Sequence, residues 1–319
     1  MRIGALLTNR KDSFTVRDVP RNSVRDVDHP LRARLAILGA AILFSTGGAA
    51  IKATALTGWQ VASFRSMVAA VAVLLMLPAA RRGFGALSAV VAAGYAATMV
   101  LFVLANKLTT AASTIFLQST APIYLVLLGP WLLKEPIRRR DLALMGSLAL
   151  GLALFFVGRE AGSATAPDPF KGNVLAALSG LCWAFAVTGL RFMGKRGGRG
   201  GGSAAAVVLG NVFAFALALP FALPVASVRP GDVAIVVFLG VFQIGLAYVL
   251  LTYGLHHVGA LEASLLLLAE PVLNPLWAWL VHGERPSSWT FAGGAVIVAA
   301  TLGKSLSARY AGADVEPSA

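Results

Sequence analysis

Cysteine, histidine and acidic residues are scarce in this sequence. Its 319 residues include one cysteine, four histidines and 14 aspartates and glutamates. The single Cys182 excludes a disulfide bond within the chain and a cysteine metal cluster. The histidines are isolated in the sequence except for the adjacent pair at 256–257, and this spacing favours no metal site. We therefore expect no metal ion and no cofactor.

Charged residues of both signs are also few, at 13% of the chain, whereas 57% of the residues are hydrophobic. Together with a mean hydropathy of +0.77, these values lie far from those of soluble globular domains and indicate an integral membrane protein. A net charge of +13 would favour nucleic-acid binding in a soluble protein. Here the basic residues form short clusters between apolar runs, so we expect them to mark membrane topology and expect no nucleic acid as a partner.

Apolar runs long enough to cross a bilayer recur along the chain. A helix needs about 20 apolar residues to span roughly 30 Å of hydrocarbon. Ten such runs predict an all-α integral membrane protein with ten transmembrane helices, at 34–52, 57–78, 85–105, 110–133, 140–158, 172–193, 204–225, 232–253, 259–281 and 288–306. Residues 1–31 carry mixed charges and no apolar segment, which predicts a disordered cytoplasmic tail, and a second short tail is expected at 307–319.

One motif of this sequence occurs twice. The stretch "APIYLVLLGPWLLKE" places Pro122 and Glu135 thirteen residues apart. The stretch "EPVLNPLWAWLVHGE" places Pro271 and Glu284 at the same spacing, and each copy precedes the last predicted helix of one half. This internal repeat divides the chain into three parts: a first five-helix unit at 32–158, an external linker at 159–171 and a second five-helix unit at 172–306.

The basic residues indicate the orientation, because Lys and Arg accumulate in cytoplasmic loops. With the N-terminus inside, twenty of the 27 Lys and Arg residues fall in inner segments and six in outer ones. We therefore expect a multi-pass protein of the cell (plasma or inner) membrane with both termini cytoplasmic. Five crossings are an odd number, so the second unit should enter the membrane inverted relative to the first. Inverted repeats are typical of alternating-access carriers, in which two halves enclose a central site.

Four stretches of the chain resemble a known family: "AAILFSTGGAAIK", "ASFRSMVAA", "KLTTAASTIFLQSTAPIYLVLLGPWLLKEP" and its echo "LHHVGALEASLLLLAEPVLNPLWAWLVHGERP". With the ten-helix pattern, they resemble the EamA family of the drug/metabolite transporter (DMT) superfamily over about residues 32–306. The resemblance implies a cavity between the first four helices of each unit, with 140–158 and 288–306 as outer supports. It also implies transport of amino acids, other metabolites or toxic compounds.

Glu270 and Arg65 are the two ionisable residues that we place near the middle of the membrane. Glu270 lies about ten residues into the segment 259–281, or roughly 15 Å at 1.5 Å per residue. A carboxylate facing lipid there would cost on the order of a few kcal/mol, so it should face a cavity or a partner, or carry a proton. Three roles stay open: a structural ion pair or hydrogen bond, proton coupling, and direct substrate binding. The matching position in the first unit is Ala121, which weighs against a purely architectural role.

A set of polar and aromatic residues completes the expected lining of the cavity. These further candidates for the substrate or proton pathway are Tyr95, Thr114, Gln118, Trp183, Asn211, Gln243, Tyr248 and Asn274. For each of them, interhelical hydrogen bonding or anchoring at the membrane interface is the alternative. Pro122 and Pro271 each remove a backbone hydrogen bond inside a helix, which frees a carbonyl group or kinks the helix for packing. Glu135 and Glu284 lie at helix ends on opposite surfaces, where we expect structural roles.

These patterns predict a secondary active transporter that moves small organic metabolites or amino acids by alternating access, with export favoured over uptake. The drive would be the solute gradient alone or protons bound at Glu270, because the sequence carries no Walker loop. The alternatives are a membrane-embedded enzyme and a non-transporting sensor or scaffold. The helix interiors contain no Asp or His placed for catalysis, so we expect no enzyme.

The expected partners are a small-molecule solute, the lipid bilayer and protons. Glycines in two of the predicted helices, 140–158 and 288–306, permit close helix packing. That packing is either within the chain or between two copies in a homodimer.

Overall fold

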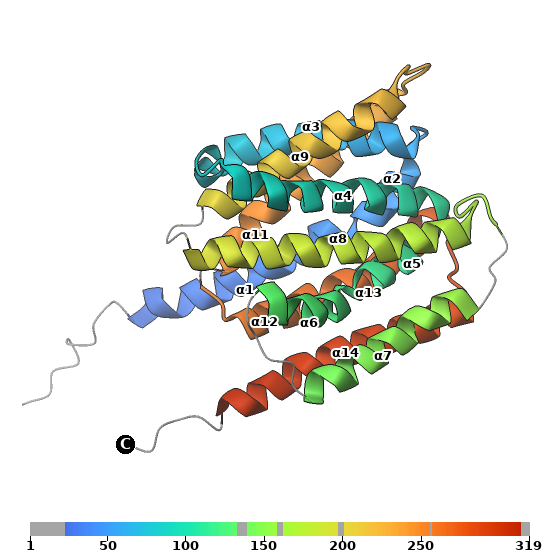
Figure 1. The fold of residues 1–319 in the computed structure, drawn as a ribbon. Coiled ribbons are helices and arrows are strands. Elements are labelled where there is room, and N and C mark those ends of the chain that lie inside the picture. The colour runs from blue at the N-terminus through green and yellow to red at the C-terminus, as the bar shows by residue number, and fades with distance from the viewer. Residues whose placement is uncertain (1–22, 133–138, 158–161, 197–200, 256, 314–319) are drawn as a thin grey trace, which may run out of the picture.

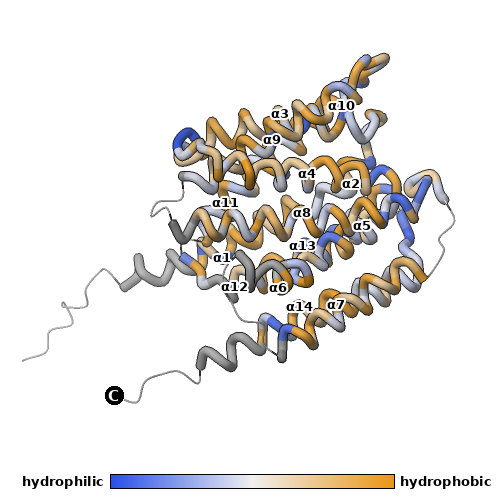
Figure 2. The backbone as a smooth tube through the Cα atoms, in the orientation of Figure 1, coloured by the Kyte–Doolittle hydropathy of each residue, from blue (hydrophilic) through white to orange (hydrophobic). Residues whose placement is uncertain are grey.

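The protein is described by a computed structural model that covers residues 23–132, 139–157, 162–196, 201–255 and 257–313. All regular elements in these ranges are helices, with one isolated β-bridge between Ser163 and Ala166. Eight helical stretches in these ranges, three of which run across two or more of the elements named below, are long and apolar enough to cross a membrane. Apolar residues cover most of the helix lengths, and hydrophilic residues gather toward the helix ends (Figure 2). The protein is therefore an all-α, multi-pass membrane protein, and the count of ten crossings stays a prediction.

The helices of the first half follow the predicted apolar runs closely (Figure 1). They are α1 (Ser23–Ser45), α2 (Gly47–Ala53), α3 (Gly58–Met76), the short 3-10 helix η1 (Pro78–Arg81), α4 (Ala86–Leu108), α5 (Ala111–Gln118), α6 (Ala121–Leu132) and α7 (Arg139–Val157). Those of the second half are α8 (Pro169–Arg196), α9 (Gly201–Ala222), α10 (Pro230–Phe238), the π-helix η2 (Leu239–Leu246), α11 (Ala247–Leu255), α12 (Ala260–Leu267), α13 (Ala269–His282) and α14 (Ser288–Ala313).

The prolines of the repeated motif explain why two predicted helices are each divided. A proline ring clashes with the carbonyl group four residues before it, so the preceding helix stops there. The helix α5 ends at Gln118, four residues before Pro122, and α12 ends at Leu267, four residues before Pro271. Both halves of the chain thus have a helix interrupted at the same place in the motif.

The first and last helices extend beyond the apolar runs that predict them. The helix α1 begins at Ser23, so residues 23–31, which we predict as part of a disordered tail, are helical. The helix α14 continues to Ala313, seven residues into the predicted C-terminal tail at 307–319. Hydropathy marks the part of a helix that lies in hydrocarbon, whereas the helix itself can continue into water. The remainder of the predicted N-terminal tail and Glu135 lie outside the described residues.

Helices from the two halves of the chain interleave. The helix α4 packs against α8 and α9, and α3 packs against α9, so the first and second halves share one core. The first helix begins and the last helix ends on the same side of the molecule (Figure 1).

The helices α7 and α14 lie together at one edge of the bundle (Figure 1). Their glycines allow the close approach, because a Cβ atom on Gly151 would lie 3.1 Å from the Gly293 carbonyl oxygen and 2.7 Å from Ile297. The predicted glycine packing therefore joins these two helices within the chain, and a homodimer stays a prediction.

Candidate functional site

Arg65 lies on α3 inside the helix bundle. The helix begins with a capping box, in which Thr57 accepts a hydrogen bond from the Gln60 amide and Gln60 accepts one from the Thr57 amide. This start places Arg65 two turns into the helix, where its side chain is 1% exposed. Its Nη2 donates a hydrogen bond to the Met99 carbonyl oxygen at 3.2 Å, and its Nε has no partner. No acidic group of the described residues neutralises the Arg65 guanidinium.

Glu270 is the second residue of α13, directly after the break that Pro271 imposes. Its side chain is half-buried, and no Lys or Arg of the described residues forms an ion pair with it. Arg65 and Glu270, which we expect at a similar depth, are therefore not paired with each other. An ion pair with Arg65 is thus absent, whereas a structural hydrogen bond, proton coupling and substrate binding all stay predictions for Glu270.

Aromatic side chains that contact one another lie near both Arg65 and Glu270. Tyr95 on α4 interacts electrostatically with Arg65, and Tyr248 on α11 interacts with Glu270. The two tyrosine rings are in contact, with centroids 6.1 Å apart. Trp183 lies 6.4 Å from Tyr95, and Phe44 lies 5.5 Å from Tyr248. Tyr95, Trp183 and Tyr248 thus form one aromatic cluster from helices of both halves, near Arg65 and Glu270. A role of these residues in a solute pathway stays a prediction.

Three amide side chains from the prediction are buried in the same core. Asn211 on α9 donates to the Val207 carbonyl oxygen at 2.9 Å, and its Oδ1 has no partner. Gln243 lies on the π-helix η2, a type of element that is frequent at functional sites, and its Oε1 has no partner either. Asn274 is 0% exposed, and neither its Oδ1 nor its Nδ2 has a partner. Buried amide atoms without partners are rare, so a ligand or water is expected at these positions.

Two other predicted residues have different surroundings. The Thr114 hydroxyl donates to the Thr110 carbonyl oxygen of its own helix at 3.0 Å. Gln118 donates to the Ser179 hydroxyl on α8 at 2.8 Å. The Gln118 bond is an interhelical hydrogen bond, which is the alternative to a role in the substrate or proton pathway. The Thr114 bond is local to its own helix.

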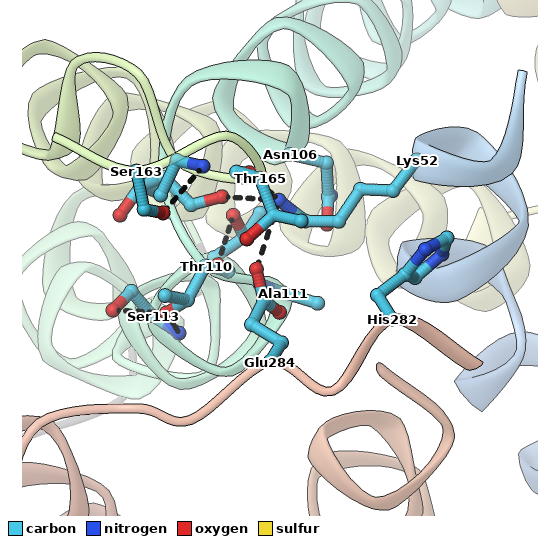
Figure 3. A network of polar contacts seen from close by, with 12 residues as sticks. Lys52, Asn106, Thr110, Ala111, Ser113, Ser163, Thr165, His282 and Glu284 are labelled. Atoms are coloured by element: carbon cyan, nitrogen blue, oxygen red, sulfur yellow. Dashed lines mark hydrogen bonds and ion pairs between the residues drawn. The ribbon is translucent and has the colours of Figure 1, made fainter. Parts of the chain in front are cut away.

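A buried ion pair that the sequence analysis did not identify joins the two halves of the chain (Figure 3). Lys52 at the end of α2 lies 3.1 Å from Glu284, which follows α13, and the two side chains are 4% and 2% exposed. The Lys52 ammonium group also donates to the carbonyl oxygens of Thr109 and Thr165. The other Glu284 oxygen accepts the amide hydrogen of Ala111 at 2.8 Å, at the N-terminus of α5, where the helix dipole favours a carboxylate.

A second pair of charged residues lies at the same end of the bundle. Lys107 on α4 donates to the Thr54 carbonyl oxygen at 2.8 Å and interacts electrostatically with Lys52 and Asp232. Asp232, on α10 and 4% exposed, accepts the amide hydrogen of Ala55 at 2.8 Å. Within the described ranges, no group of three His, Cys, Asp or Glu side chains could hold a metal ion.

The architecture and the buried polar site define a polytopic membrane protein with charged groups inside its helix bundle. Residues 170–306 match the EamA-like transporter family. This match confirms the resemblance that the sequence motifs predict and indicates a membrane transporter of the drug/metabolite type. Over residues 32–158, the resemblance stays a prediction.

Comparison with solved structures supports the fold. Fourteen chains match, and one of them, known from a crystal structure, has a TM-score of 0.58. That match covers 87% of this chain and 98% of the other chain at 21% sequence identity, and at this identity it shows a shared fold alone. No curated protein matches the sequence.

Proposed function

We propose that the protein is a secondary active transporter that exports small organic metabolites or amino acids by alternating access. The observation that carries the proposal is that Arg65 and Glu270, residues of opposite charge type inside a membrane-spanning bundle, form no ion pair with any described residue. A buried charge without a partner costs several kcal/mol by rough estimate, so such groups are usually retained for function. A transported solute can supply the missing partners.

The proposal includes an inverted repeat of two five-helix units, at 32–158 and 172–306, connected by an external linker at 159–171. The matched breaks before Pro122 and Pro271 support it, because the same motif interrupts a helix in each half. Breaks within membrane helices are common where transporters bind substrates and ions.

Alternating access requires that one end of the site is closed at a time. The buried Lys52–Glu284 pair joins the two halves at the end of the bundle that the charge distribution assigns to the outside. The pair Arg34–Glu262, which joins α1 and α12 at the other end, has side chains that are 51% and 43% exposed. We propose that the present conformation is closed outside by Lys52 and Glu284, in a cell membrane with both termini cytoplasmic.

Glu270 is the proposed proton carrier. It has no cationic partner among the described residues, and it lies at the helix break between α12 and α13 in the second half. A carboxyl group in this position can bind a proton on one side of the membrane and release it on the other.

Counterflow in liposomes tests the transport function directly. Purified protein is reconstituted into vesicles loaded with a pool of unlabelled amino acids and metabolites, and entry of labelled members of the same pool is measured. We expect accelerated entry of at least one labelled solute, chemically unchanged. Chemical conversion of the solute would instead indicate an enzyme. Absence of flux with every pool would indicate a sensor or scaffold, and either outcome would overturn the proposal.

A further inference from the structure

Two buried asparagines direct oxygen atoms into the same small space. Gly48 on α2 has no side chain, and a Cβ atom placed there would lie 2.7 Å from Asn274 Oδ1, 2.8 Å from the Ala111 Cβ atom and 3.1 Å from Asn106 Oδ1, so both oxygens closely approach the Gly48 backbone. Both asparagines are 0% exposed, and neither oxygen has a hydrogen-bond partner. Asn106 lies on α4 and Asn274 on α13, so the two oxygens come from different halves of the chain.

The orientation of the Asn106 amide is determined by its own helix. Its Nδ2 donates to the Phe102 carbonyl oxygen at 2.9 Å, so its Oδ1 faces away from this contact, toward Gly48. On α13, Glu270 lies four residues before Asn274, so the two side chains share one face of the helix. Two amide oxygens without donors therefore face Gly48, and Glu270 lies one helical turn before Asn274 on the same face of α13.

We propose that Asn106, Asn274 and Glu270 form a cation subsite, which binds either Na⁺ or the ammonium group of an organic solute. Carboxylate and amide oxygens are suitable ligands for a hard cation, and their combined charge favours a monovalent one. A proton on Glu270 would neutralise the carboxylate but would leave both amide oxygens without a partner. A cation in the space beside Gly48 satisfies all three groups.

Only the ammonium form of this proposal rests on the proposed transport function, since Na⁺ can bind to a protein that transports nothing. The two cation sources are distinguished by thermal unfolding of the purified full chain in four salts at equal ionic strength: sodium, potassium, methylammonium and choline chloride. A ligand that binds the folded state raises the unfolding midpoint. We expect the midpoint in sodium or in methylammonium chloride to exceed that in choline chloride by a few degrees.

Two variants identify the groups that bind the cation. Asn106→Leu and Asn274→Leu each remove one of the oxygens at nearly constant volume, and the difference between the salts should disappear in both. Asn173→Leu is the control, because Asn173 is also a buried asparagine whose Nδ2 donates to a carbonyl oxygen, that of Phe155, but its Oδ1 already accepts a hydrogen bond from the Thr109 hydroxyl and is not free for a cation. This control should retain the difference between the salts.

Each variant is compared with itself across salts, so a lower baseline stability does not affect the result. If an asparagine variant fails to fold, binding of radioactive Na⁺ and of methylammonium to the wild-type protein replaces the measurement. Equal midpoints in all four salts, a salt effect that persists in both asparagine variants, or no binding of either ion would overturn the subsite. If counterflow is observed but the salts have no effect on unfolding, the subsite is wrong and the transport function stands. If the salts have an effect but no solute flux is observed, the transport function is wrong and the subsite stands.

Discussion

Arg65 has the features of a side chain kept for binding rather than for stability. It is buried in the bundle, yet among the described residues it bonds to the carbonyl oxygen and the sulfur of Met99 alone, and its Nε has no partner there. An apolar side chain of similar size often replaces a buried charge at no cost in stability. A structural role and a substrate-binding role therefore predict opposite effects of the same substitution.

For Arg65→Met, we expect an unfolding midpoint equal to or above that of the wild type, because the unpaired charge is removed. We also expect solute affinity to fall by about tenfold or more, since a charge-assisted hydrogen bond contributes roughly 1.5–3 kcal/mol. Thermal unfolding and counterflow measure the two quantities. Arg81→Met is the control, because Arg81 bonds to carbonyl oxygens at the exposed end of α3 and should leave flux unchanged. Strong destabilisation by Arg65→Met would show that the guanidinium is structural.

Between elements, the buried Lys52–Glu284 pair is the main polar connection of α2, the start of α5 and the segment after α13 (Figure 3). Removing one partner leaves the other charge buried, which typically costs about 3–5 kcal/mol. Arg34 and Glu262 lie half in solvent, so removing one of them leaves no buried charge behind.

We therefore expect Lys52→Met and Glu284→Gln each to lower the unfolding midpoint markedly, and the double variant to cost less than the two single ones combined. The control Glu262→Gln breaks the exposed pair and should lower stability by no more than about 1 kcal/mol. Thermal unfolding of the purified variants measures all four. Strictly additive losses in the double variant would mean that Lys52 and Glu284 are not energetically coupled.

Helix existence was predictable in detail, because long apolar runs and the prolines of the repeated motif act through local sequence. Pro122 and Pro271 explain where α5 and α12 end, but the breaks were not predicted, since Pro220 and Pro275 lie inside helices that continue through them. Tertiary neighbours were not predictable in the same way. Equal depth in the membrane left an ion pair between Arg65 and Glu270 open, because depth says nothing about the direction in which a side chain leaves its helix. Their separation by Tyr95 and Tyr248 depends on how helices from both halves pack.

The same limit explains the residues that the sequence analysis missed. Lys52 is a single lysine at the end of an apolar run, which has the pattern of a topology signal, and its partner Glu284 is far away in the sequence. Asn106 falls in the stretch "LANKL", where the sequence indicates a turn, but the helix α4 continues through it to Leu108. The π-helix that carries Gln243 has no sequence signature that could have been used.

For the molecule as a whole, the orientation in the membrane decides which end of the helix bundle faces the cytoplasm. Single cysteines in a Cys182→Ser background test it. Lys171→Cys lies in the segment predicted to be external and Arg82→Cys in one predicted to be cytoplasmic, and both positions are exposed. We expect an impermeant maleimide to label position 171 in intact cells and position 82 only after permeabilisation. The reverse pattern would invert the topology and place the Lys52–Glu284 pair at the cytoplasmic end.

In the proposed mechanism, the site around Arg65 and Glu270 carries a solute together with a proton. The most direct measurement uses liposomes with a pH-sensitive dye inside, the reconstituted protein, and pooled amino acids and metabolites added outside. We expect a solute-dependent pH change with the wild-type protein, and with Glu270→Gln we expect none, although that variant should still exchange labelled solute. A pH change of the same size in Glu270→Gln would contradict the account, because the proton would then travel without Glu270.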